Sequence, residues 1–168
     1  MSREITLNGN KFSLFGAELN AGLKAPDFTL GANDLSDVSL NDFKGRVVVL
    51  SAVPSLDTPT CSIETARFNK EAGKLGDKVK ILTVSKDLPF AQARWCAAQG
   101  VKNLQTLSDY KNTSFSQDYG LLINGLYLLT RAVFVVDGEG IIRYVQFVKE
   151  VSNEPDYKAV LDAVNELI

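Results

Sequence analysis

Apolar and polar residues form alternating blocks along this chain, and these blocks predict a succession of strands and helices. The uninterrupted apolar run 46–53, which is rich in β-branched residues, is typical of a buried strand. Further strands are expected at residues 79–84, 104–107, 132–136 and 141–145. Helices are expected from residue 59 to Gly73 or Gly76, at 90–99 and at 155–168, with one or two helical turns at 113–118.

Residues 1–20 have the pattern of a β-hairpin, because two strand-like segments flank Asn8-Gly9, a strong two-residue turn signal. Two more short strands are expected at 28–30 and 38–40. The order β-α-β-α-β, followed by a hairpin and a helix, predicts an α/β sheet with helices on both faces. This order suits a single domain over residues 1–168, with a thioredoxin-like fold and the hairpin 1–20 as an N-terminal extension.

The composition is that of an ordinary globular protein: of 168 residues, 45% are hydrophobic and 23% charged, and the formal net charge is −2. No basic run suggests a nucleic-acid partner. The first residues lack a signal-peptide pattern, and the longest charge-free apolar stretch, 119–130, is shorter than the ~20 residues that span a bilayer. We therefore expect a cytoplasmic protein that has neither a membrane nor a nucleic acid as partner.

The sequence contains no histidine and two cysteines. The missing histidine excludes Ser-His-Asp triads, Cys-His dyads and histidine metal sites, and two cysteines are too few for a structural zinc site. We expect no metal and no other cofactor. Any reactive cysteine has to be activated by backbone dipoles, hydroxyl groups or arginine.

The segment after the apolar run 46–53 predicts a cysteine at a helix start. It reads Pro54-Ser55-Leu56-Asp57-Thr58-Pro59-Thr60-Cys61. Thr58 is the expected N-cap and Pro59 the first helical residue, so Cys61 lies in the first turn. Unpaired N–H groups and the helix dipole favour the nucleophilic thiolate there. Alternatively, Cys61 is only a small buried hydrophobe, although the carboxyl edge of a parallel sheet favours reactivity. Thr58 either only caps the helix or also bonds the sulfur or a bound peroxide oxygen, and Pro54 either ends the strand or shields the sulfur from water.

Three more side chains have two interpretations each. Cys96, 35 residues after Cys61, is either a packing residue within a helix or a second redox thiol, but not part of a C-x-x-C motif. Arg131 is either an edge arginine or a cation that points at Cys61 from a neighbouring strand end. Glu64 either holds such an arginine or is a solvated helix residue. The rival arginines, on sequence alone, are Arg67, Arg94 and Arg143.

The chain resembles the bacterial thiol peroxidase branch of the atypical two-cysteine peroxiredoxins. The matching segments are 51–65 around Cys61, Arg94-Trp95-Cys96, 131–137 and Gly22-x-x-Ala25-Pro26-Asp27-Phe28, and the N-terminal hairpin also fits. The resemblance implies that Cys61 is the peroxidatic cysteine and that Cys96 is the resolving cysteine. It also implies that Thr58, Pro54 and Arg131 complete the pocket around Cys61.

The resemblance further implies a hydroperoxide substrate, thioredoxin as reductant and a homodimer. Cys61 would become a sulfenic acid, and Cys96 would convert it to an intramolecular disulfide. Because both thiols are expected in helices, we predict that both helices partly unwind during turnover. The apolar run 121–129 is core, a subunit interface or a substrate wall. Two alternatives to a peroxidase are a thiol-based redox sensor and a general thiol–disulfide oxidoreductase.

Overall fold

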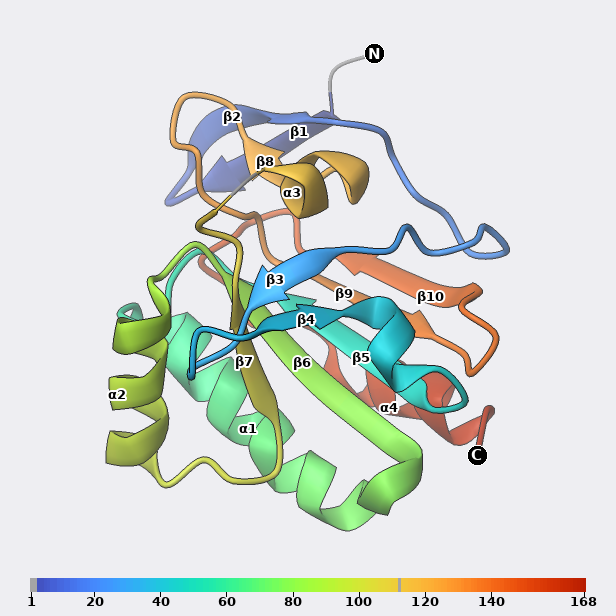
Figure 1. Cartoon of the computed structure of the whole chain (residues 1–168). Helices are drawn as coiled ribbons and strands as arrows, with labels where there is room; N and C mark the ends of the chain where they lie inside the picture. The colour runs from blue at the N-terminus through green and yellow to red at the C-terminus, as the bar shows by residue number, and fades with distance from the viewer. Residues whose placement is uncertain (1–2, 112) are drawn as a thin grey trace.

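A seven-stranded sheet lies at the centre of the computed structural model, which describes residues 3–111 and 113–168. Its strand order is β10-β9-β5-β6-β7-β3-β4 (Figure 1). The strands are β3 (Thr29–Gly31), β4 (Asp37–Ser39), β5 (Val47–Ala52), β6 (Val79–Ser85), β7 (Gln105–Ser108), β9 (Ala132–Val136) and β10 (Ile142–Phe147). Strands β5, β6 and β7 are parallel, and β9 runs antiparallel to β5. The carboxyl ends of β5 and β6 therefore share an edge with the start of β9.

Helices cover both faces of this sheet, as predicted. The helices are α1 (Pro59–Leu75), α2 (Pro89–Gln99), α3 (Ser114–Asp118) and α4 (Tyr157–Asn165), with short 3-10 helices η1 (Leu40–Phe43) and η2 (Gly76–Lys78). Val47 and Val49 of β5 pack with α1 and α4, whereas Val48 and Leu50 face the opposite core with α3. This alternation is the two-residue period of a strand. Each fully buried Val or Leu side chain contributes about 1.5–3 kcal/mol.

Aromatic side chains fill the core on the α3 face. Phe115 of α3 and the adjacent Tyr119 pack together, and each lies against Phe28. Tyr119 meets Phe134 of β9 edge-on, with ring centroids 5.3 Å apart, a favoured geometry for aromatic pairs. The Tyr119 hydroxyl donates to the Pro26 carbonyl at 2.5 Å, so its buried polar end is satisfied. Among the described residues, no helix has both the length and the hydropathy that a transmembrane span requires.

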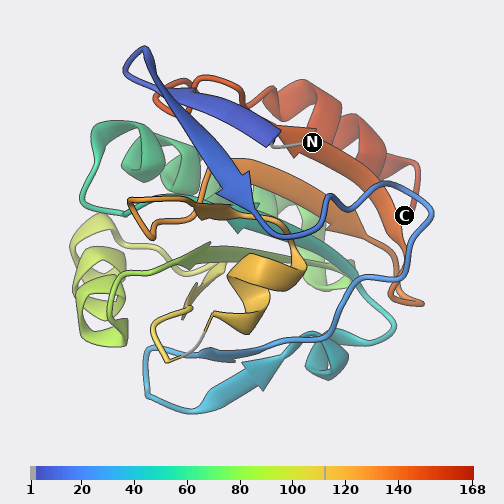
Figure 2. The same cartoon turned by 90° about the horizontal axis from the view of Figure 1, so that it is seen from above.

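The predicted N-terminal hairpin is confirmed: β1 (Arg3–Leu7) pairs with β2 (Asn10–Phe15). Asn8 and Gly9 at its turn both have positive φ, 52° and 81°, which matches the right-handed twist of the strands. The sequence did not predict that β8 (Leu122–Ile123) adds a third strand to this hairpin. In the run 121–129, Leu121, Leu122, Ile123 and Leu129 are buried. The hairpin lies above the central sheet in Figure 1, and in Figure 2, which looks down from that side, it lies in front of the sheet; Thr6 of β1 pairs with Glu150 in the segment that follows β10.

Candidate active site

Cys61 lies in the first turn of α1, directly after the loop that leaves β5. Thr58 is the N-cap residue and Pro59 the first helical residue, as predicted. The Cys61 side chain has no exposed surface, and it packs against Val53 and Leu56. The helix end supplies unpaired backbone N–H groups and a positive dipole at this position. The site is therefore buried, largely apolar and electropositive on the helix side.

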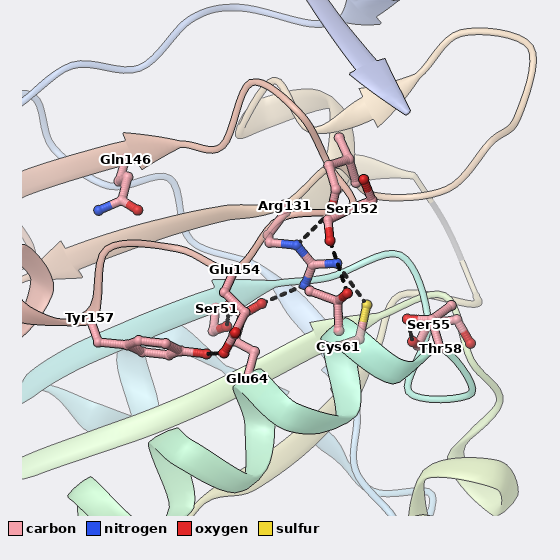
Figure 3. A network of polar contacts seen from close by, with 12 residues as sticks. Ser51, Ser55, Thr58, Cys61, Glu64, Arg131, Gln146, Ser152, Glu154 and Tyr157 are labelled. Atoms are coloured by element: carbon pink, nitrogen blue, oxygen red, sulfur yellow. Dashed lines mark hydrogen bonds and ion pairs between the residues drawn. The ribbon is translucent and has the colours of Figure 1, made fainter. Parts of the chain in front are cut away.

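Arg131 reaches the Cys61 sulfur from the neighbouring strand. Its Nη2 donates to Sγ of Cys61 at 3.2 Å, and only 2% of the arginine is exposed (Figure 3). The reason is the alternation of β9: Val133 and Val135 face α1, so Arg131, two residues before Val133, faces the same side. The pairing of Ala52 with Ala132 places the arginine at the carboxyl end of β5.

The rival arginines engage elsewhere or lie at the surface. Arg67 pairs with Glu71 on the exposed side of α1, and Arg143 pairs with Asp137 in the β9–β10 turn. Arg94 is exposed on α2. Of the four arginines considered from the sequence, Arg131 is the one whose contact with the Cys61 sulfur the structure shows.

Glu64 holds Arg131, which decides between the two interpretations of this glutamate. Its carboxylate forms a 2.5 Å ion pair with Nη1 of Arg131 and accepts a 2.9 Å hydrogen bond from Oγ of Ser51 (Figure 3). Nε of Arg131 donates to the Val151 carbonyl at 2.8 Å. The guanidinium is thus bound by the sulfur, a carboxylate and a carbonyl, and each of its nitrogens has a partner. This fixes the direction of its positive charge toward Cys61.

Burial and pairing act in opposite directions on the two charged groups. Burial raises the pKa of the Glu64 carboxyl above its ordinary value, and the charge of Arg131 opposes this shift. Burial alone would lower the pKa of the Arg131 guanidinium, but Glu64 and Cys61 raise it above the ordinary value. Arg131 is therefore a permanent cation beside the sulfur. Loss of either partner would leave a buried charge without compensation.

Thr58 and Pro54 lie in the loop between β5 and α1. Pro54 is buried, and Thr58 is half-buried. Thr58 occupies the N-cap position, but its side chain makes no capping bond to the helix, and its hydroxyl proton is directed to a loop carbonyl and not to the sulfur. Instead, its hydroxyl and its backbone N–H both bond the Ser55 carbonyl, at 2.9 and 3.1 Å. These two hydrogen bonds to one carbonyl close the loop. The hydroxyl oxygen of Thr58 keeps lone pairs that can accept a further hydrogen bond.

Cys96 lies on α2, is half-buried, and contacts β7 with its sulfur. Its Sγ lies 3.4 Å from Oγ1 of Thr106 on β7, beside a cavity of about 310 Å³. The preceding residue, Trp95, instead faces α1: its Nε1 donates to Oγ of Ser62 at 3.1 Å, and its ring packs beside Cys61. Adjacent helical residues point about 100° apart, and here Trp95 takes the direction of α1 while Cys96 takes that of β7. Both cysteines are free thiols on separate helices.

Comparison with known proteins identifies the family of this chain. Residues 20–161 match the redoxin family. The thiol peroxidase of Oceanobacillus iheyensis is 54% identical over 161 residues, which are 96% of this chain and 98% of that protein. The thiol peroxidase of Bacillus subtilis is 47% identical, with 98% of each chain covered. This chain belongs to the redoxin family.

Solved structures lead to the same assignment. The peroxiredoxin-like protein from Aquifex aeolicus has a TM-score of 0.93 at 40% identity. The alignment covers 100% of this chain and 99% of the Aquifex chain. The thiol peroxidase from Chromobacterium violaceum has a TM-score of 0.88 at 19% identity, covers 99% of this chain and 98% of its own, and thus shares the fold. Within the redoxin family the chain is a peroxiredoxin-type thiol peroxidase, and the predicted thioredoxin-like fold and peroxidase class are confirmed.

Three participants in this candidate site were not predicted. Ser51, which bonds Glu64, is the one polar residue of the buried strand β5, and this isolated polarity was an available signal. Trp95, adjacent to a cysteine, also offered a signal. Val151 acts through its backbone carbonyl, so the sequence holds no trace of its contact with Arg131. Backbone partners of this kind depend on the fold and not on residue type.

Proposed function

We propose that this protein reduces hydroperoxides through a Cys61 thiolate and takes its electrons from thioredoxin. The observation that carries the proposal is the 3.2 Å contact between Arg131 and the buried Cys61 sulfur at the start of α1. A fixed cation at a helix N-terminus stabilises negative charge on sulfur, and the thiolate is the reactive form. The names of the relatives, thiol peroxidases, support the same substrate class.

In the first step, the Cys61 thiolate attacks the terminal oxygen of ROOH. An S–O bond forms, the O–O bond breaks, and the leaving RO⁻ takes a proton to become an alcohol or water. Cys61 is oxidised to a sulfenic acid while the peroxide is reduced. Arg131 stabilises the charge that moves from sulfur to oxygen. Thr58 is proposed to bond a peroxide oxygen after its hydroxyl leaves the Ser55 carbonyl, and Pro54 to keep water from the sulfur.

In the second step, the Cys96 thiol attacks the sulfur of the sulfenic acid, forms a Cys61–Cys96 disulfide and releases water. Thioredoxin then reduces the disulfide by thiol–disulfide exchange and becomes oxidised itself. A disulfide needs an S–S distance of about 2.05 Å with Cα atoms within ~7 Å. Because Cys96 faces Thr106 while Trp95 occupies the side toward α1, the start of α1 and the middle of α2 have to unwind in part.

The deciding experiment is peroxide-dependent NADPH oxidation with thioredoxin and thioredoxin reductase. Sustained turnover by the intact protein is expected, and Cys96→Ser is expected to stop after one oxidation per chain. If the intact protein oxidises once and stops, the redox-sensor alternative is favoured. If it reduces protein disulfides without peroxide, the general oxidoreductase alternative is favoured. Mass mapping of trapped sulfenic acid assigns the oxidised residue.

The proposed unwinding predicts a change in tryptophan fluorescence. Trp95 is the single tryptophan of the chain and bridges α2 to α1. We expect its emission to change in two phases when reduced protein meets peroxide, first with sulfenic acid and then with disulfide formation. Cys96→Ser serves as the control and should show the first phase alone. Identical backbones around both cysteines in crystals of the two redox states would contradict the unwinding.

We also propose that the protein acts as a homodimer in the cytoplasm, as its resemblance to atypical two-cysteine peroxiredoxins implies. The segment 121–129 supports an interface, because Tyr127 is 69% exposed and Leu126 is 36% exposed beside the buried part of the run. Sedimentation equilibrium should give twice the mass of the chain at micromolar concentration. A monomer under these conditions would contradict the proposed dimer.

A further inference from the structure

The segment 148–152, which follows β10, contacts both Arg131 and the first turn of α1, which carries Cys61. The Val151 carbonyl accepts the hydrogen bond from Nε of Arg131 at 2.8 Å. The Ser152 carbonyl accepts one from Oγ1 of Thr60, in the first turn of α1, at 2.9 Å. Figure 3 shows Ser152 beside Arg131. The direction of the guanidinium therefore depends on where this segment lies.

The N-terminal hairpin holds the same segment from the other side. The backbone N–H of Thr6 donates to the Lys149 carbonyl, and the N–H of Val151 donates to the Thr6 carbonyl, both at 2.8 Å. The Val151 side chain is fully buried in a cluster with Ile5 and Leu14 of the hairpin. Val151 is thus bound to β1 through its N–H and to Arg131 through its carbonyl, which links the hairpin to the site through one residue.

Glu150 fastens this contact with its carboxylate. It accepts from the backbone N–H groups of Gly9 at 2.8 Å and Asn8 at 3.2 Å, both at the hairpin turn. It also accepts from the hydroxyl of Thr6 at 3.2 Å, and from the N–H and hydroxyl of Ser152 at 2.9 and 2.5 Å. The donors from Ser152 foremost, and those from Gly9 and Asn8, lower the pKa of the carboxyl to about 2, so it stays ionised at neutral pH.

We propose that Glu150 is a positioning residue for the peroxidase reaction, and that through it the N-terminal hairpin keeps Arg131 directed at Cys61. The inference rests on the proposed roles of Cys61 and Arg131. None of the hairpin residues named here is bonded to the sulfur, so the proposed effect on Arg131 passes through the Val151 carbonyl. Small displacements of a group that stabilises charge have large consequences, because a shift of about 1 Å can cost on the order of 10²-fold in rate.

The test is the second-order rate of Cys61 oxidation by peroxide in the full-length Glu150→Gln variant. The backbone and Ser152 partners of the Glu150 carboxylate all donate hydrogen bonds to it. In glutamine an NH2 group, which is itself a donor, replaces one carboxylate oxygen and can no longer accept from these partners. We expect the rate to fall about tenfold. The matched control is Glu139→Gln, an exposed glutamate in the β9–β10 turn that removes the same charge. Its rate should equal that of the intact protein.

The coupling to Arg131 separates positioning from general stabilisation of the fold. In an Arg131→Met background, adding Glu150→Gln should cause no further loss of rate, because the group that it positions is already gone. An undiminished loss in that background, or an unchanged rate in Glu150→Gln alone, would overturn the inference. If Glu150→Gln does not fold, Thr6→Val, which removes one donor and keeps the backbone ladder, gives the same comparison.

Failure of the proposed function is recognised separately. It would appear as an intact protein that does not consume peroxide at all. In that case the rate of alkylation of Cys61 by iodoacetamide, measured in the Cys96→Ser variant, still reports how well Arg131 supports the thiolate. A slower alkylation in Glu150→Gln but not in Glu139→Gln would support the positioning role, and equal rates would overturn it.

Discussion

Cys61→Ser is expected to abolish peroxide reduction, with a loss on the order of 10⁴-fold or more, as for removal of a nucleophile in other enzymes with covalent intermediates. A serine hydroxyl is not ionised at neutral pH, so Arg131 and the helix end have no thiolate to stabilise. The substitution changes one atom in a fully buried site, and Nη2 of Arg131 can still donate to the new oxygen. Stopped-flow measurement of peroxide consumption, with circular dichroism to confirm folding, tests this.

Cys96→Ser is the matched control because it removes the other thiol by the same change of one atom. It should consume one equivalent of peroxide at the rate of the intact protein and then stop. The opposite pattern, in which Cys61→Ser still reacts and Cys96→Ser does not, would assign the nucleophile to Cys96. The structure argues against that pattern, since Cys96 bonds a neutral threonine hydroxyl, whereas Cys61 bonds a guanidinium.

The local patterns of the sequence were sufficient to predict the elements that position Cys61. The buried strand 46–53 and the helix start at Thr58-Pro59 both follow from residue types at short range. The turn Asn8-Gly9 identified the hairpin for the same reason. These features form as predicted because local preference and tertiary packing agree at each of them.

The pairing of distant segments was beyond the sequence. Strand β8 has two residues, too few for a two-residue period, so its place beside β2 could not be inferred. Glu64 had two equal interpretations because a charged residue one turn into a helix is ordinarily solvated. It is buried here because β9 brings Arg131 to the same place from 67 residues away. The direction of Cys96 likewise depends on how α2 packs against β7.

Arg131→Met is expected to lower the rate of Cys61 oxidation by about 10²–10³-fold, the usual cost of removing a group that stabilises transition-state charge. It is also expected to destabilise the fold by about 3–5 kcal/mol, because Glu64 is left buried without its cation. The two losses have different causes. Peroxide kinetics measures the first, and chemical denaturation measures the second.

The pH dependence of stability in Arg131→Met has a definite sign. Without the opposing cation, burial holds the pKa of Glu64 further above its ordinary value near 4.5. A carboxyl whose pKa is raised in the folded state binds its proton more tightly there than in the unfolded chain. The contribution of Glu64 to the stability of the variant should therefore be most favourable below about pH 4.5 and decline as the pH rises through the raised pKa, which chemical denaturation at a series of pH values measures against the intact protein. The intact protein should show a weaker decline.

The double variant Glu64→Gln/Arg131→Met separates catalysis from folding. Removing both charges should recover most of the lost stability, since replacing a buried ion pair by neutral groups is often close to neutral. The decline with pH should disappear together with the carboxylate. The rate of Cys61 oxidation should stay at the level of Arg131→Met, because the sulfur still lacks its cation. A double variant that regained the rate along with the stability would mean that Arg131 serves the fold alone, and that the helix end suffices to activate Cys61.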